Sequence, residues 1–145
     1  MKTLTILFAI ATLALPAYSD TRFSVIGEDA GKIQLDATEL SKDLKAKVLD
    51  ESKVKADIAA LGQDIIKLRK DVETIDASLN SLTAEQKKDW ELIKTKVQLL
   101  NIFYDRKTDL LQGDLKKNRS MLRAHADGIA KRAALLRETA MKMKS

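Results

Sequence analysis

Residues 54–82 read VKADIAALGQDIIKLRKDVETIDASLNSL, and this stretch decides the fold class. Its large aliphatic residues recur at alternating steps of four and three positions, which is the spacing of one stripe along an α-helix. The stripe has to be covered by another helix, because an amphipathic helix of this kind is not stable alone in water. Its members are Val54, Ile58, Leu61, Ile65, Leu68, Val72, Ile75, Leu79 and Leu82.

The helix that carries this stripe is expected to begin upstream, at residues 36–39. Their sequence, Asp-Ala-Thr-Glu, has the spacing of a capping box, in which the first and fourth side chains bind each other's backbone N–H. Two polar residues, Lys47 and Glu51, interrupt the stripe. Either the apolar stripe shifts locally onto Val48 and Leu49, which we favour, or the two polar residues make the pairing of the helix with its partner specific. The sequence predicts a helix over residues 36–80, about 65 Å long.

A second capping box, Thr83-Ala84-Glu85-Gln86, follows a short polar stretch. A short turn between two long helices implies an antiparallel hairpin. One continuous rod is the competing interpretation, because no Pro or Gly forces a break at this point.

Two more apolar stripes follow the turn. The first is broad and comprises Trp90, Ile93, Val97, Leu100, Tyr104 and Leu111. After a predicted break at Gly113-Asp114, the second alternates alanines with larger residues, so it permits close helix approach: Leu122, Ala126, Ile129, Ala133, Leu136, Ala140 and Met143. We therefore expect an all-α fold over residues 36–145, a long antiparallel helical hairpin or coiled coil with a third C-terminal segment. It would form a three-segment bundle or a dimer of hairpins, and the surplus apolar surface favours a homo-oligomer.

Residues 1–19 have the layout of a secretory signal peptide. Lys2 precedes an uncharged apolar run, and small residues at positions 17 and 19 predict cleavage before Asp20. The apolar run is shorter than the roughly 20 residues that a membrane span needs, although an uncleaved N-terminal anchor remains the alternative. We expect a periplasmic or secreted protein. Residues 20–35, which include Gly27 and Gly31, are predicted to form an extended arm.

The inventory of reactive side chains is small. The chain has no cysteine, and His125 is its only histidine, which excludes thiolate chemistry and any multi-histidine site within one chain. No phosphate-binding loop, nucleophile elbow or zinc-protease motif is present. We expect a protein that is not an enzyme and that uses no cofactor and no metal ion.

The positive charge is concentrated at the C-terminus. Residues 114–145 carry nine Lys and Arg against three Asp and Glu. An ordinary solvated helix face is the first interpretation of this charge. If the segment binds a partner, anionic lipid headgroups or acidic polymers are expected. Nucleic acid is not expected, because the protein is exported and no aromatic residue follows Tyr104.

Residues 82–88 read LTAEQKK and follow the heptad-rich helix. This resembles the LTxxQ signature of the periplasmic Spy/CpxP chaperone family, with Leu82, Thr83 and Gln86 at the motif positions and the likeness covering residues 50–96. One such motif is present, where the family usually carries two. The resemblance implies a small exported all-α protein that dimerises and binds unfolded clients through a mixed apolar and basic surface. A generic exported coiled-coil protein is the alternative, because the physics of a capping box is general.

We expect the protein to act by binding protein clients or envelope components. Large aromatics and arginines are favoured at contact surfaces, and burial inside the bundle is the alternative for the aromatics. Two other functions stay open, a scaffolding coiled coil and a binder of anionic membrane surfaces. The expected contact residues are Trp90, Phe103 and Tyr104 as apolar groups, with Arg119, Arg123 and Lys131 as cations.

Overall fold

The computed structural model describes the backbone of residues 4–143 and the side chains of residues 22–143. Over this range the chain forms five α-helices, one short 3₁₀ helix and no strand, which confirms the all-α class. The elements are α1 (Leu4–Lys45), α2 (Glu51–Asp76), the 3₁₀ helix η1 (Leu79–Ser81), α3 (Ala84–Asp105), α4 (Thr108–Gln112) and α5 (Leu115–Lys142).

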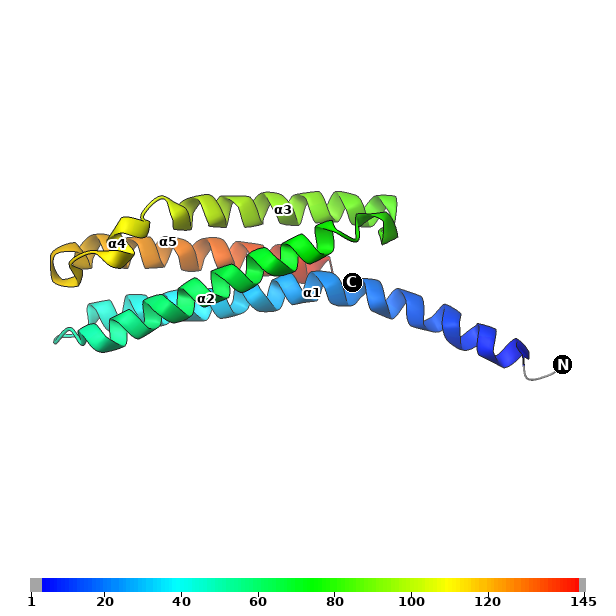
Figure 1. Cartoon of the computed structure of the whole chain (residues 1–145), viewed down its shortest axis with the longest axis horizontal. Coiled ribbons are helices and arrows are strands. Elements are labelled where there is room, and N and C mark those ends of the chain that lie inside the picture. The colour runs from blue at the N-terminus through cyan, green and yellow to red at the C-terminus, as the bar shows by residue number, and fades with distance from the viewer. Residues whose placement is uncertain (1–3, 144–145) are drawn as a thin grey trace.

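Four long helices lie side by side, each running opposite to the one before it, with α4 as a short connection between α3 and α5 (Figure 1). The most extensive backbone contact joins α1 to α5, followed by α1 with α2 and then α3 with α5. Helices α2 and α3 are linked through side chains, for example Arg69 Nη2 with Asp105 Oδ1 at 2.8 Å. The predicted pairing of residues 36–80 with the helix after Thr83 is therefore not the main contact of the fold.

The prediction that residues 20–35 form an extended arm is wrong, because α1 runs through all of them. Phe23, Ile26, Ala30 and Ile33 are buried, and their steps of three and four continue the helical stripe upstream. Gly27, which lies within the predicted arm, is a helix position that α5 approaches closely. A Cβ atom there would lie 2.8 Å from Met141 Sδ.

The predicted helix start at Asp36 and the uninterrupted helix over residues 36–80 are also wrong. The chain bends at residues 46–50, and Asp50 caps α2 by accepting a hydrogen bond from the Lys53 backbone N–H at 3.1 Å. Lys47 lies in this bend and Glu51 is the first residue of α2. The polar interruption of the stripe is thus a connection between two helices, and neither a register shift nor a pairing device.

The core is built from the predicted stripes. Val54, Leu61, Ile65 and Leu68 of α2 are fully or almost fully buried. The predicted C-terminal stripe is buried from Leu122 to Ala140. Its alanines, together with small residues of α1, let the two helix backbones come close, which explains why α1 and α5 share the largest contact.

The start of the predicted signal peptide, residues 1–3, lies outside the described residues. Helix α1 passes the predicted cleavage position before Asp20 without a break, and its first part extends beyond the bundle in Figure 1. Cleavage there would leave the packed part of α1 intact, because Phe23 is the first described side chain that is buried. Among the helices that the structure describes, none combines the length and apolar character that a membrane span requires.

Candidate functional site

Two hollows lie along the contact between α3 and α5. The larger, of about 280 Å³, is lined by Leu99, Lys131, Arg132 and Leu135. The smaller, of about 200 Å³, is lined by Phe103, Lys107, Met121, Ala124 and His125. The hollows adjoin, because the guanidinium carbon of Arg132 lies 3.7 Å from the centre of the Phe103 ring. We call these nine residues the α3/α5 groove.

The α3/α5 groove combines exposed apolar groups with positive charge. Leu99 is 52% exposed, Leu135 46% and Met121 50%. Single exposed apolar residues are ordinary on protein surfaces, but here three line adjoining hollows. The charged residues of the lining, Lys107, Lys131 and Arg132, are all cationic. The groove therefore suits an apolar partner that also carries carboxylates.

Phe103 contacts two charged or polar neighbours. The Arg132 guanidinium lies over its ring, and the His125 ring stacks on it with centroids 5.0 Å apart. Gly128 makes room for this arrangement, since a Cβ atom there would lie 2.3 Å from Phe103 Cζ. Arg132 also donates to the Gly128 carbonyl oxygen at 3.1 Å. The Arg132 guanidinium at the centre of the groove is thus held by two contacts, the Phe103 ring and the Gly128 carbonyl oxygen.

His125 forms the buried floor of the smaller hollow and is 3% exposed. Burial lowers the pKa of His125; the Tyr104 backbone and the Asp109 charge oppose this shift, whereas the charges of Lys107 and Arg132 add to it. Neither ring nitrogen has a hydrogen-bond partner of good geometry among the described residues. A buried ring whose pKa is lowered is suited to packing against Phe103 in its neutral form.

Trp90, predicted as a contact residue, lies inside the bundle and has no exposed surface. Its ring stacks on Phe23 of α1 with centroids 6.0 Å apart, and its Nε1 donates to Asp76 Oδ1 at 2.8 Å. Trp90 therefore joins α1, the end of α2 and the start of α3. For Trp90, burial inside the bundle, which was the alternative to a role as a contact residue, is therefore correct.

Tyr104 lies away from the α3/α5 groove and is half-buried against α2. Its hydroxyl oxygen would lie 3.4 Å from a Cβ atom placed on Gly62. Burial raises the pKa of Tyr104, and the charge of Arg69 opposes the shift. Of the three predicted aromatic contact residues, only Phe103 lines the groove.

The three predicted cations occupy different environments on α5. Arg119 donates from Nε to the Leu44 carbonyl oxygen at 2.6 Å and from its guanidinium to the Ala46 carbonyl oxygen, so it caps the C-terminal end of α1. Arg123 is exposed and lies outside the residues that line the groove. Lys131 is exposed and lines the larger hollow.

The LTxxQ residues build the start of α3. Leu82 is buried. The Thr83 hydroxyl oxygen accepts a hydrogen bond from the Gln86 backbone N–H at 3.2 Å, and Gln86 Oε1 accepts from the Thr83 backbone N–H at 2.9 Å. The predicted second capping box is confirmed, and it satisfies backbone groups that the helix start would otherwise leave unpaired.

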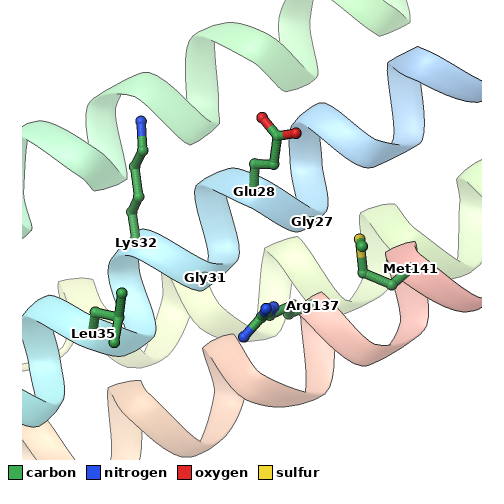
Figure 2. Close-up of a pocket in the computed structure, with 7 residues that line it drawn as sticks. All are labelled: Gly27, Glu28, Gly31, Lys32, Leu35, Arg137 and Met141. Carbon is green, nitrogen blue, oxygen red and sulfur yellow. The ribbon is translucent and has the colours of Figure 1, made fainter.

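A further hollow, of about 310 Å³, lies between α1 and α5 (Figure 2). Arg137 and Met141 of α5 lie opposite Gly27 and Gly31, while Glu28 and Lys32 point away from α5 (Figure 2). Its lining carries both signs of charge, unlike the α3/α5 groove. The α3/α5 groove is therefore the better candidate for a site with a defined charge preference.

The sequence predicted Phe103 and Lys131 of the groove but not the residues around them. Leu99, Arg132 and Leu135 were not predicted, because an apolar or basic stripe in the sequence does not say which residues border a neighbouring helix. Among the described side chains, no group of three His, Cys, Asp or Glu is placed to hold a metal ion.

No protein-family model, curated protein or solved structure gives a significant match to this chain. The resemblance to the Spy/CpxP family stays a prediction.

Proposed function

We propose that this chain is an exported, non-enzymatic binding protein that holds unfolded or extended protein segments in the α3/α5 groove. The preferred segments carry apolar side chains flanked by aspartate or glutamate. Binding of unfolded clients is the activity that the resemblance of residues 82–88 to the Spy/CpxP family implies. The predicted signal peptide at residues 1–19 would deliver the protein to the periplasm or to the exterior.

One observation carries the proposal: exposed Leu99 and Leu135 lie beside Lys131 and Arg132 in the same hollow. Leucines supply a favourable free energy for burial of an apolar partner, about 25 cal/mol per Å² of apolar surface. The lysine and the arginine favour partners with nearby carboxylates and disfavour basic ones. Because Arg132 is already stacked on Phe103, little side-chain entropy is lost when it binds.

The size of the hollows favours a peptide segment over a small molecule. Their volumes, about 280 and 200 Å³, are below the roughly 300–1,000 Å³ of ordinary small-molecule pockets. Each accommodates one or two side chains. Successive apolar side chains of an extended or helical segment can therefore occupy adjoining hollows along α3 and α5.

A scaffolding function through the heptad stripe is less well supported. The stripe is covered within one chain, where Leu61, Ile65 and Leu68 are at most 1% exposed. A homo-oligomer would have to use other apolar groups, such as Ile66, which is 58% exposed. We therefore place client binding first and retain self-association as a property to be measured.

Binding of a labelled peptide tests the proposal. The probe is a fluorescein-labelled peptide of leucines flanked by glutamates, with a second peptide that replaces the glutamates by lysines, and binding is read by fluorescence polarisation. The glutamate peptide should bind and the lysine peptide should not. Lys131→Glu should weaken binding roughly tenfold, which corresponds to about 1.4 kcal/mol. Lys117→Glu, on the same helix but outside the groove lining, is the matched charge control.

A second pair of variants tests the apolar part of the groove. Leu99→Gln should weaken binding, whereas Ile66→Gln, an equally polar change at an exposed position of α2, should not. The wild-type protein should also suppress aggregation of an unfolded acidic protein at near-stoichiometric amounts. Equal effects of groove and control variants would contradict the proposal. Sedimentation with anionic vesicles that both charge variants weaken equally would instead favour the membrane surface as partner.

A further inference from the structure

Aspartates recur every seven residues on both α1 and α2, and the antiparallel packing of the two helices brings them together. Each aspartate of α1 faces one of α2, with the two carboxyl groups close enough to hydrogen bond. The pairs follow one another along the contact between the helices. Because α1 and α2 are antiparallel, a step of seven residues forward on α1 corresponds to a step of seven residues back on α2. We call them the aspartate ladder: Asp29 with Asp71, Asp36 with Asp64, and Asp43 with Asp57.

The ladder is partly shielded from solvent. Asp29 is 2% exposed and Asp43 9%, and the other four aspartates are half-buried. The Oδ2 atoms of Asp29, Asp43 and Asp57 are buried and have no hydrogen-bond donor among the described residues. Two ionised carboxylates cannot donate to each other, whereas a pair that holds one proton makes a short, strong hydrogen bond. In the two outer pairs, one shared proton would supply the donor that these buried oxygens lack.

Lysines neutralise the outer pairs only in part. Lys67 Nζ lies 2.7 Å from Asp29 Oδ1 and 2.6 Å from Asp71 Oδ2. At the other end, Lys53 Nζ lies 2.8 Å from Asp43 Oδ1 and 3.5 Å from Glu39 Oε1. Lys42 and Lys70 add weaker favourable charge, to Asp43 and Asp71 respectively.

The central pair, Asp36 with Asp64, forms no ion pair with any lysine or arginine that the structure describes. Helix α5 packs on α1 elsewhere: Arg119 binds the Leu44 and Ala46 carbonyl oxygens, and Asp127 accepts a hydrogen bond from Ser41. Arg137 lies against Gly31. The proton is thus the natural counter-charge for the central pair.

We propose that the aspartate ladder is a proton-dependent latch, which holds α2 against α1 while each pair shares one proton and loosens that contact when the pairs become fully ionised. The latch acts on a specific element, because the close backbone contacts of α2 are with α1. Side-chain bonds such as Arg69 to Asp105 tie α2 to α3. Loosening would expose buried apolar residues of α2, among them Leu61 and Leu68.

In each pair of the ladder, one carboxyl group has a raised pKa, as expected if the pair shares a proton. Burial, with the hydrogen bond and charge of the facing carboxyl group, raises the pKa of Asp29, Asp36 and Asp57 to about 6 each. The hydrogen bonds of Lys53 and Asp57 lower the pKa of Asp43. Burial raises the pKa of Asp71, but hydrogen bonds with Asp29 and Lys67 outweigh it and lower the value.

The sign of the pH dependence follows from these directions. Between about pH 4 and pH 6 the folded chain binds more protons at the raised sites than the unfolded chain does, so the free energy of unfolding decreases as the pH rises. The contact between α1 and α2 is therefore tightest in mild acid and weaker at neutral pH.

The central pair gives the cleanest test, with the full chain and the variant Asp36→Asn. An asparagine amide donates to the Asp64 carboxylate at any pH, so the variant should melt roughly 5 °C above wild type at about pH 7.5 and close to it at about pH 5. Glu73→Gln, at an exposed position of α2, removes the same charge and should keep the wild-type pH dependence. Equal pH dependence in the two variants would overturn the proposal.

Two measurements on wild-type protein do not depend on any variant folding. The Cγ resonances of the aspartates, followed by nuclear magnetic resonance, should show three carboxyl groups that titrate near pH 6. Hydrogen exchange of α2 amides, corrected for the intrinsic rate, should be faster at about pH 7.5 than at about pH 5, with α3 changing less. Titration of all six ladder aspartates below about pH 4.5, or uniform exchange across the helices, would exclude the latch.

Discussion

The Nε1 atom of Trp90 donates a hydrogen bond to Asp76 Oδ1 at 2.8 Å, which ties the first turns of α3 to the end of α2. Lys94 Nζ lies 3.3 Å from the same oxygen. The indole ring stacks on Phe23, so one side chain connects three helices. Trp90 is consequently a structural residue, and its replacement should act on stability before it acts on binding.

Replacement of Trp90 separates the hydrogen bond from the packing. Trp90→Phe retains the stack on Phe23 but loses the bond to Asp76, which should cost about 1–2 kcal/mol. Trp90→Ala also leaves a large cavity and should cost about 3–5 kcal/mol. Urea unfolding followed by circular dichroism measures both. A loss below about 1 kcal/mol for Trp90→Ala would show that the ring is not packed as described.

A methyl group at Gly128 should disrupt the α3/α5 groove. The Cβ atom of Gly128→Ala would lie 2.3 Å from Phe103 Cζ, so the ring on which Arg132 stacks has to shift. We expect a loss of about 1–3 kcal/mol in the free energy of unfolding. Gly62→Ala is the matched control, since its nearest neighbour is the Tyr104 hydroxyl oxygen at 3.4 Å and a helix gains up to about 1 kcal/mol from alanine.

His125 should lower the free energy of unfolding as the pH falls, whereas the aspartate ladder should raise it. Because its folded-state pKa is lowered, chiefly by burial, its contribution is present above the ordinary histidine pKa and is lost as the pH falls below it. His125→Phe removes this titration. The stability of the variant relative to wild type should increase from about pH 7.5 to about pH 5. A constant difference over that range would indicate that His125 is not buried.

Two neighbouring arginines of α5 should behave differently. Arg119→Ala leaves the Leu44 and Ala46 carbonyl oxygens at the end of α1 without their donor, which should cost about 1–3 kcal/mol. Arg123→Ala, at an exposed position four residues away, should change stability by less than about 0.5 kcal/mol. Thermal unfolding of both variants tests this, and equal values would argue against the cap.

The LTxxQ motif should contribute to stability through its capping box. Thr83→Ala removes the acceptor for the Gln86 backbone N–H and should cost about 0.5–2 kcal/mol. Thr95→Ala, on the exposed side of the same helix, removes only a bond to the Glu91 carbonyl oxygen and serves as the control. Peptide binding by folded Thr83→Ala should equal that of wild type. Loss of binding without loss of stability would assign the motif a direct role in the partner contact.

The groove was only partly predictable, because it depends on which helix lies beside α3. Phe103 and Lys131 could be chosen by residue type, since aromatics and cations favour contact surfaces. Trp90 met the same criterion and is buried, while Arg119 is occupied by the end of α1. Residue type does not separate a surface contact from a core contact when a helix is apolar over a wide arc.

Local patterns in the sequence are enough to predict the helical character of residues 54–76, the helix start at Thr83, the break at Gly113-Asp114 and the alanine-rich face of α5. Each of these rests on local periodicity or capping, which act within a few residues. The tertiary structure decided that residues 20–35 are helical, because packing on α5 outweighs the two glycines there. It also decided that Asp36 faces Asp64: both heptads of aspartates are visible in the sequence, but only the antiparallel register of α1 and α2 joins them.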